Sequence, residues 1–168
     1  MAWIKRGSET GIDEVFMRNV GVKSLEDIND WFRKSYANEY RLDGINEAVS
    51  LAESFKNDTV TVVGDYDGDG ITSTSILVTA LRWAGFIDVR YRIPKRFSEG
   101  FGINKGIIDE IDGGLIITCD NGYAQPEVIQ YAKDKGLCVI VIDHHLPEVN
   151  DGSVVKCPAD IAIDPNAI

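Results

Sequence analysis

The pattern of hydrophobic and polar positions changes near residue 59. Residues 44–56 carry apolar side chains at three- and four-residue spacing, which marks one face of an α-helix. Further upstream, Ser24 is followed three residues later by Asp27 and then by an apolar run, an order typical of a helix start. We therefore expect residues 1–57 to form a helical N-terminal segment that packs on the remainder.

From residue 59 onward, short β-branched runs alternate with helical stretches. The pattern predicts strands at residues 60–63, 89–93, 115–118, 138–142 and 161–163, and helices at residues 72–84, 105–110 and 125–135. Several strands are apolar almost throughout, as in TVTVV, LIIT and CVIVI, which is typical of strands covered on both faces. The predicted fold class is therefore α/β, a mostly parallel sheet sandwiched by helices.

The composition narrows the class of protein. The chain has 168 residues, of which 44% are hydrophobic and 26% charged, the size and balance of one globular domain. No apolar run reaches the length of a membrane span, and the N-terminus lacks the apolar core of a signal peptide. We therefore expect a cytoplasmic protein without a membrane partner. Three cysteines without CxxC spacing support neither a disulfide framework nor a zinc knuckle.

The net charge of −10 argues against a nucleic-acid binder that relies on a broad basic surface. The charge is uneven, because residues 87–105 hold five basic and two acidic side chains, a local net of +3. Binding of a polyanion would therefore depend on this short segment, or on cations held by the acidic residues.

Polar clusters follow four of the predicted strands. They are Asp65, Asp67 and Asp69 after the first strand, Lys95 and Arg96 after the second, Asp120 and Asn121 after the third, and Asp143, His144 and His145 after the fourth. Ligands of open parallel sheets bind outside the carboxyl ends of the strands. We therefore expect carboxylates, imidazoles and a guanidinium to meet at one edge of the sheet.

The sequence GDYDGDG at residues 64–70 begins like a calcium-binding loop. Such a loop needs a glutamate at its twelfth position and a helix on each side, but the twelfth position counted from Asp65 is Ile76 and a strand precedes the loop. A solvated acidic turn does not explain the groups at neighbouring strand ends. Carboxylates with imidazoles suit Mn²⁺ or Mg²⁺. Because alternate residues of an extended segment face the same way, we expect the three aspartates to be shared by two ions, which can clamp a phosphate.

The only two histidines, His144 and His145, follow Asp143 directly. We interpret them as ligands, the alternative being a pair of turn histidines of which one caps the strand and one is exposed. We expect Asp143 to orient a histidine rather than to bind metal itself, as carboxylates next to metal-bound histidines commonly do.

The stretch RYRIPKRFSEGFGIN at residues 90–104 begins within the second predicted strand and continues beyond it. We expect Arg96 to bind a phosphate and Gly100 and Gly102 to let the backbone approach it closely. A solvated basic loop is the alternative. Phe97 and Phe101 are expected to be buried, although stacking on a nucleobase is open to both.

Together these stretches resemble the DHH phosphoesterase family, and within it the RecJ-type single-strand-specific exonucleases. The matching motifs are VVGDYDGDGITST at residues 62–74, PKRFSEGFGIN at 94–104, TCDNG at 118–122 and IDHH at 142–145, in the family's order. Relatives that act on small substrates carry a histidine where this chain has Val63, which favours the RecJ-type branch and leaves Asp65 to take over that histidine's role.

The resemblance implies a phosphodiesterase with two Mn²⁺ (or Mg²⁺) ions that degrades single-stranded DNA from the 5′ end in DNA repair or recombination. It implies Asp65 and Asp67 as ligands of one ion, Asp69 and His144 as ligands of the second, and Asp120 as a ligand of both. It implies that His145 contacts the scissile phosphate and that Arg96 grips a substrate phosphate beside Gly100 and Gly102. The catalytic set is then Asp67, Asp69, Asp120, His144 and His145.

In the family, another aspartate completes the second ion's shell well downstream of the histidines, and a second domain of the DHHA1 type closes over the substrate. This chain ends 23 residues after His145. Asp164 lies in IDPN, where relatives tend to have asparagine, and we do not expect it to substitute. We therefore expect residues 58–168 to be a DHH domain truncated before a DHHA1-like domain, with weak or absent nuclease activity alone.

Two alternatives stay open within the resemblance. One is a phosphodiesterase for small substrates such as oligonucleotides, cyclic dinucleotides or pyrophosphate. The other is a non-catalytic DHH module that binds nucleic acid or a protein partner. A receiver-type signalling domain would share an acidic pocket on a parallel sheet, but it explains neither histidine. The oligomeric state is open.

Overall fold

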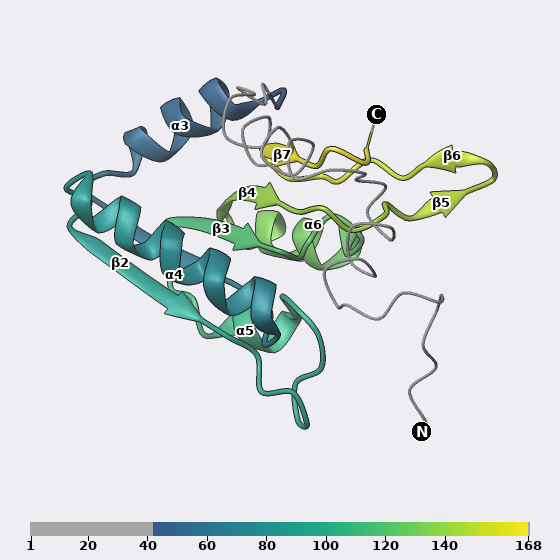
Figure 1. Cartoon of the computed structure of the whole chain (residues 1–168), viewed down its shortest axis with the longest axis horizontal. Coiled ribbons are helices and arrows are strands. Elements are labelled where there is room, and N and C mark those ends of the chain that lie inside the picture. Colours follow the sequence, from purple (N-terminus) through teal and green to yellow (C-terminus); the bar gives the residue numbers. More distant parts are fainter. Residues whose placement is uncertain (1–41, 168) are drawn as a thin grey trace, which may run out of the picture. The chain divides into compact units, whose positions relative to one another are not determined.

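The computed structural model describes residues 42–167, whose main sheet has five parallel strands. They are β1 (Thr59–Val63), β2 (Asp88–Arg92), β3 (Leu115–Cys119), β4 (Cys138–Ile142) and β7 (Ile161–Ile163), in the order β2-β1-β3-β4-β7 across the sheet (Figure 1). A two-stranded antiparallel hairpin, β5 (Val149–Asn150) and β6 (Ser153–Val154), was not predicted. The predicted α/β class with a parallel sheet is confirmed.

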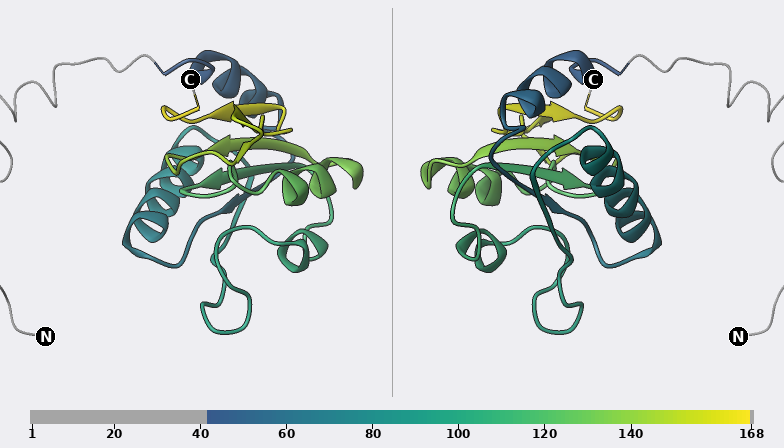
Figure 2. Two further views of the ribbon diagram at one scale, coloured as in Figure 1. Left: turned by 90° about the vertical axis from the view of Figure 1, so that its right-hand side faces the viewer. Right: turned by 90° about the vertical axis from the view of Figure 1, so that its left-hand side faces the viewer.

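Helices cover both faces of the sheet (Figure 2). They are α3 (Ile45–Ser54) and α4 (Gly68–Trp83) on one face, and α5 (Lys105–Asp109) and α6 (Pro126–Asp134) on the other. The first core contains Ala48 and Ala52 of α3 and Val78 and Leu81 of α4, and the second contains Ile107 and Ile108 of α5 and Ile129 and Ala132 of α6. No helix within residues 42–167 combines the length and the apolar composition that crossing a membrane requires.

The apolar runs form strands because successive side chains enter opposite cores. Val62 of β1 packs in the first core, whereas its neighbour Val63 packs in the second, and Ile116 and Ile117 of β3 divide in the same way. All five residues of β3 are buried. Burying one such aliphatic side chain contributes about 1.5–3 kcal/mol, so a strand covered on both faces is stabilised at every position.

The winding direction of the chain reverses between β1 and β3. From β1 the chain crosses to β2 on one side and then returns to β3 on the other side of β1. The connecting helices α4 and α6 therefore lie on opposite faces, and the carboxyl ends of β1 and β3 diverge into separate loops at this switch point. Ligands of open parallel sheets bind at such a position. The strand order thus selects the edge where the predicted polar clusters meet.

The register brings the strand ends to a common level. Val63, the last residue of β1, pairs with Thr118 of β3. Beyond the strands, the backbone N–H of Asp120 donates to the carbonyl of Ile142 at 2.9 Å, and the N–H of Asp143 donates to Ile163 at 3.0 Å. The residues directly after β3 and β4 are therefore still held by the sheet.

The predicted N-terminal segment is described only in part. Its last helix is observed as α3 within residues 44–56, and α3 shares its core with the sheet. The helix start predicted near Ser24, and residues 1–41 as a whole, lie outside the described residues. The boundary predicted at residue 57 stays a prediction.

Candidate metal centre

The first acidic segment connects β1 to α4. Asp67 caps α4, because its side chain accepts a hydrogen bond from the N–H of Gly70 at 3.0 Å, and this bond lowers the pKa of Asp67. Gly70 lies so close to Asp65 that a Cβ there would overlap the backbone. Asp65 is buried, and its Oδ1 accepts from the N–H of Tyr66 at 2.6 Å and from that of Gly102 at 3.3 Å. The two carboxylates are thus fixed by backbone donors.

Asp69 has an environment different from the one that its spacing predicted. α4 begins at Gly68, four residues before the predicted start at residue 72, because Asp67 caps it there. Asp69 therefore lies exposed in the first helical turn. The expectation that three alternate aspartates face the same way is wrong for Asp69, since the alternation holds only in extended backbone. Its role as a ligand stays a prediction.

Asp120 follows β3 in a strained backbone conformation. Its φ of 63° lies in the left-handed region, which residues other than glycine seldom adopt. Burial, and next the negative charge of Asp67, raise the pKa of the Asp120 carboxyl. Backbone strain of this kind persists where the surrounding structure enforces it, and it is typical of functional sites.

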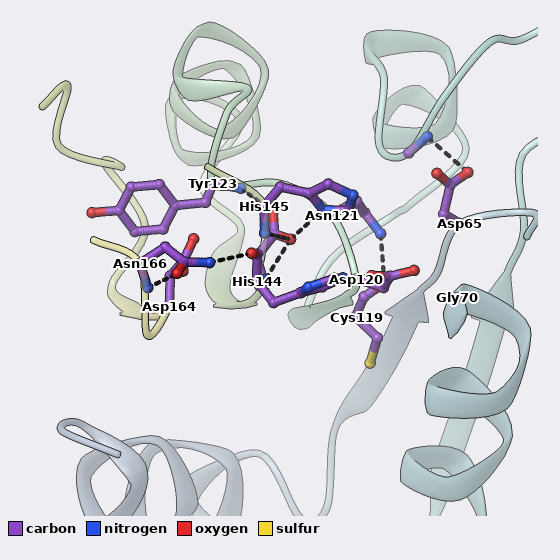
Figure 3. Close-up of polar contacts among 12 residues, drawn as sticks. Asp65, Gly70, Cys119, Asp120, Asn121, Tyr123, His144, His145, Asp164 and Asn166 are labelled. Atoms are coloured by element: carbon purple, nitrogen blue, oxygen red, sulfur yellow. Dashed lines mark hydrogen bonds and ion pairs between the residues drawn. The ribbon is translucent and has the colours of Figure 1, made fainter. Parts of the chain in front are cut away.

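Three side chains gather at the ends of β3 and β4 (Figure 3). His144 Nε2 lies 2.8 Å from Asp120 Oδ1, and the ring centroids of His144 and His145 are 4.7 Å apart. Donor atoms from Asp120, His144 and His145 all lie within 4.8 Å of one another. The imidazoles are exposed and the carboxylate is buried, so this donor set opens toward solvent. It is a candidate metal-binding site.

Asp143 lies behind the imidazoles and is hydrogen-bonded through both oxygens. Oδ1 accepts from Nδ1–H of His145 at 2.7 Å and from the N–H of His144 at 2.7 Å, while Oδ2 accepts from the N–H of Tyr123 at 3.0 Å. Burial opposes ionisation, but these bonds keep the pKa of Asp143 below its ordinary value. With Nδ1 engaged, Nε2 is the His145 atom left for a ligand. This is the arrangement that the predicted orienting role requires.

Electrostatics link the first acidic segment to the three donors. The hydrogen bond that His145 donates to Asp143 raises the pKa of His145, and the charges of Asp120 and Asp65 raise it further. The negative charge of Asp67 contributes to the raised pKa of Asp120. Asp65 and Asp67 therefore lie within electrostatic reach of the three-residue set without belonging to it. We refer to Asp65, Asp67, Asp120, Asp143, His144 and His145 as the acid–imidazole cluster.

Residues 94–104 form a loop that extends away from the sheet (Figure 2). The Arg96 guanidinium carbon lies 5.3 Å from the centroid of the Tyr66 ring, and the Tyr66 and Phe101 centroids are 5.3 Å apart. The expectation that Phe97 and Phe101 are buried is wrong, since they are 99% and 72% exposed. The apolar side chain of this loop that enters the core is Ile103, which is fully buried.

The two loop glycines are needed for different reasons. Gly100 and Gly102 both have positive φ, 80° and 56°. A Cβ on Gly102 would lie 2.8 Å from the Cβ of Asn121, whereas a Cβ on Gly100 would meet nothing within 4 Å. Gly102 is thus explained by close packing and Gly100 by its conformation. Their contact with a substrate stays a prediction.

Part of the basic segment is neutralised inside the fold. Arg92 forms ion pairs with Glu99 and Glu110, each at 2.8 Å, and Arg90 pairs with Asp88 at 2.7 Å. Lys95 and Arg96 form no ion pair within residues 42–167, so they carry the positive charge of the loop. We refer to Arg92, Glu99 and Glu110 as the ion-pair cluster.

The structure adds residues that the sequence patterns did not select. The Asn166 side chain donates to the carbonyl of His144, and Asp164 Oδ1 accepts from the N–H of Asn166 at 2.7 Å (Figure 3). Asp164 Oδ2 is buried without a hydrogen-bond partner among the described residues, and burial raises the pKa of this carboxyl. Both residues follow β7, whose carboxyl end is the sequence signal that could have placed them near the histidines.

The donor set fits a divalent cation. Its atoms are carboxylate oxygens and imidazole nitrogens, which suit Mn²⁺ and Mg²⁺. The neighbouring thiol belongs to Cys119, which is buried, and burial raises its pKa to about 12, so no thiolate competes. A cation would also offset the repulsion between Asp120 and Asp67.

Fold and site together define an α/β protein with an acidic, imidazole-containing ligand site at the switch point of a parallel sheet. Residues 59–162 match the model of the DHH family, N-terminal domain. The chain belongs to the DHH family, which confirms the resemblance predicted from the four motifs.

Relatives within the family are RecJ proteins. The chain is 40% identical over 138 residues to the single-stranded-DNA-specific exonuclease RecJ of Haemophilus influenzae, covering 79% of this chain and 23% of the relative. It is 37% identical to RecJ of Escherichia coli, covering 75% and 22%. A crystal structure of exonuclease RecJ bound to manganese matches with a TM-score of 0.64 and 34% identity, covering 74% of this chain and 31% of the other. The chain thus spans less than a quarter of these two curated relatives.

Proposed function

We propose that the chain carries the metal-binding part of a phosphodiesterase that degrades single-stranded DNA. The observation that carries the proposal is the donor set of Asp120, His144 and His145 at the switch point of the sheet. The 34–40% identity to RecJ proteins and the manganese in the RecJ crystal structure support it. The family match over residues 59–162 supports a DHH domain over residues 58–168.

The cofactor we propose is Mn²⁺ or Mg²⁺, with two ions in the whole enzyme. Asp65, Asp67, Asp120 and His144 are the proposed ligands, and Asp69 is a further candidate at the start of α4. When bound, the ions supply Lewis acidity toward a phosphodiester. The strained backbone of Asp120 and the cap formed by Asp67 hold these carboxylates in place before any ion arrives.

The remaining residues of the site bind and orient. Asp143 fixes the ring of His145 through Nδ1, which leaves Nε2 to contact a phosphate oxygen. The guanidinium of Arg96 lies over the ring of Tyr66, the residue between Asp65 and Asp67 in the sequence. It can therefore hold a phosphate beside these two carboxylates. The exposed rings of Phe97 and Phe101 provide faces on which bases can stack.

A narrow basic loop beside an acidic site suits a single strand better than a duplex. Lys95 and Arg96 carry the positive charge on one loop, and the chain as a whole has a net charge of −10, which does not favour a broad basic face for duplex DNA. We propose single-stranded DNA as the substrate, removal of nucleotides from its 5′ end, and a role in DNA repair or recombination in the cytoplasm.

Metal titration tests the first half of the proposal. Mn²⁺ added to the chain is followed by calorimetry and by the thermal unfolding midpoint. At a free Mn²⁺ concentration 100 times the Kd, binding stabilises the fold by about 2.7 kcal/mol, and EDTA reverses the shift. Absence of any heat or shift in millimolar Mn²⁺ would contradict the metal assignment.

An exonuclease assay tests the second half and uses the whole protein. With Mn²⁺ present, a 3′-labelled single strand is expected to shorten progressively, and a blunt duplex of the same sequence is expected to persist. Faster turnover of a dinucleotide than of the long strand would reassign the protein to small-substrate phosphodiesterases. Strand binding without cleavage would instead identify a non-catalytic module.

A further inference from the structure

The side chain of Asn121 joins three separate backbone segments next to the acid–imidazole cluster. Its Oδ1 accepts from the N–H of Ile103 at 3.0 Å. Its Nδ2 donates to the carbonyl of Val63 at 3.1 Å and to that of Cys119 at 2.8 Å. Val63 ends β1, Cys119 ends β3 and Ile103 belongs to the 94–104 loop. One amide thus connects the loop to the two strand ends that lead into the candidate metal ligands.

Burial makes this connection rigid. Asn121 is 6% exposed, and each of its bonds is made to a backbone group. An amide whose oxygen faces an N–H and whose nitrogen faces two carbonyls has only one satisfactory orientation. The last pair in the β1–β3 register is Val63 with Thr118, so the Asn121 amide bridges the two strands where their ladder stops.

A second contact joins the loop to the same place. The N–H of Gly102 donates to Asp65 Oδ1 at 3.3 Å, and Gly102 packs on the Cβ of Asn121. Asp65 lies two residues beyond Val63, the last residue of β1, and Asp120 directly precedes Asn121. A shift of Asn121 would therefore move the loop relative to both Asp65 and Asp120.

Gln125 provides a comparison on the same loop. Its Nε2 donates to the carbonyls of Ile103 at 3.0 Å and Phe101 at 3.4 Å. No bond to the ends of β1 or β3 is recorded for this side chain within residues 42–167. Gln125 therefore holds the loop without linking it to the strand ends.

We propose that Asn121 is a positioning residue that fixes the phosphate-binding loop, residues 94–104, relative to the candidate metal ligands Asp65 and Asp120. The inference rests on the proposed function for its consequence, because a shared position matters when one phosphate is held by both the loop and the bound ions. Its geometric part is independent of that function.

The experiment compares Asn121→Ala with Gln125→Ala in the purified chain, with two measurements on each. Hydrogen exchange reports on the amides of Gly102 and Ile103, and a Mn²⁺ titration reports on the carboxylates. In Asn121→Ala, the Ile103 amide loses its acceptor and is expected to exchange at least about fivefold faster, and Mn²⁺ affinity is expected to fall about tenfold, as for groups that orient metal ligands. In Gln125→Ala, loop exchange rises and Mn²⁺ affinity changes less than about twofold.

The outcomes separate the two proposals. Wild-type chain that does not bind Mn²⁺ refutes the proposed function, while the exchange data still test the link between loop and strands. Equal loss of Mn²⁺ affinity in both variants, or unchanged Ile103 exchange in Asn121→Ala, overturns the positioning role.

If Asn121→Ala has no cooperative thermal transition, Asn121→Ser, which keeps one hydroxyl donor, replaces it. If neither variant folds, Asn121 serves the fold alone and the positioning role is overturned.

Discussion

The acid–imidazole cluster and the ion-pair cluster use the same kinds of side chain and hold their charges in opposite ways. In the ion-pair cluster, Arg92 faces two carboxylates, and its hydrogen bond lowers the pKa of Glu99 to about 2. In the acid–imidazole cluster, burial and the charge of Asp67 raise the pKa of Asp120. In the first cluster Arg92 pairs with both carboxylates. In the second, the charges of Asp120 and Asp67 oppose each other, although His144 Nε2 lies 2.8 Å from Asp120 Oδ1.

The difference indicates what each cluster is for. Satisfied charges stabilise the protein by themselves, and those of Arg92 and Glu99 tie the base of the 94–104 loop to β2, since Glu99 also accepts from the N–H of Lys95 at 2.7 Å. Opposed carboxylates cost stability unless a cation joins them. The first cluster therefore supports the loop, and the repulsion between Asp120 and Asp67 in the second favours binding of a cation, as the proposed function requires.

Asp120→Asn tests the acid–imidazole cluster and has the largest expected effect. Removing the charge removes a proposed metal ligand, so Mn²⁺ affinity is expected to fall more than about 100-fold, beyond the effect of groups that only orient ligands. Without metal, the variant is expected to unfold at a higher temperature than wild type, because the buried charge of Asp120 and its repulsion with Asp67 are both gone. Calorimetry and thermal unfolding measure the two effects. Asp58→Asn, at an exposed turn before β1, is the matched control and should change neither.

Arg92→Ala tests the other cluster. Arg92 is 21% exposed and holds Glu99, Glu110 and the carbonyl of Ile93, so its loss is expected to destabilise the fold by about 2 kcal/mol, as for hydrogen bonds to charged groups. Arg90→Ala is the control: Arg90 is 58% exposed, and its surface pair should contribute less than about 1 kcal/mol. Urea unfolding measures both. Equal losses would show that the ion-pair cluster has no special role.

Phe97→Ala tests whether the supported loop contacts a strand. Because Phe97 is 99% exposed, stability is expected to stay within about 0.5 kcal/mol of wild type. Loss of one base-stacking surface is expected to weaken binding of a single-stranded oligonucleotide about fivefold, measured by fluorescence anisotropy. Trp83→Ala removes another exposed ring, which is 87% exposed and lies at the end of α4. A similar loss in that control would assign the effect to general hydrophobicity.

The smallest expected effect is on acid stability. The pKa of Glu99 falls from 4.5 to about 2 on folding, through Arg92 and the N–H of Lys95. A lowered folded pKa means that the Glu99 contribution is complete above pH 4.5 and is lost as the pH falls toward 2. In Glu99→Gln this loss is absent, so its stability should depend less on pH than that of wild type within this window. Glu148→Gln, an exposed control, should follow wild type in urea unfolding between pH 2 and pH 5.

The parts of the fold that were predictable have local causes. β1, β3 and β4 were found because a strand buried on both faces is apolar along most of its length, and the observed bounds of β4 match the prediction. The start of α4 was missed because Asp67 is both a helix cap and a candidate ligand, and its pattern was interpreted as extended. The exposure of Phe97 was missed because hydrophobicity along the chain does not report whether a core lies beneath a loop.

The residues of the site also divide into those that the sequence indicated and those that only tertiary contacts revealed. Asp120, His144 and His145 were selected from their places after strands, and the structure brings them together. The link made by Asn121 was not foreseen, because its partner Val63 lies 58 residues away and a backbone carbonyl leaves no mark in a sequence. The hydrogen bond from the Asn166 side chain to the carbonyl of His144 was not foreseen for the same reason.

The sequence by itself determined the strands of the parallel sheet, the family and the identity of the acids and imidazoles at the strand ends, since burial and strand-end position are encoded by short runs of residues. Only the tertiary structure decided which charges are opposed and which are satisfied. That outcome depends on the strand order that sets Asp120 beside Asp67 and His144, and on contacts such as Arg92 with Glu110. Electrostatic energy depends on distances through space, and those distances are fixed only when the strands and loops have been assembled.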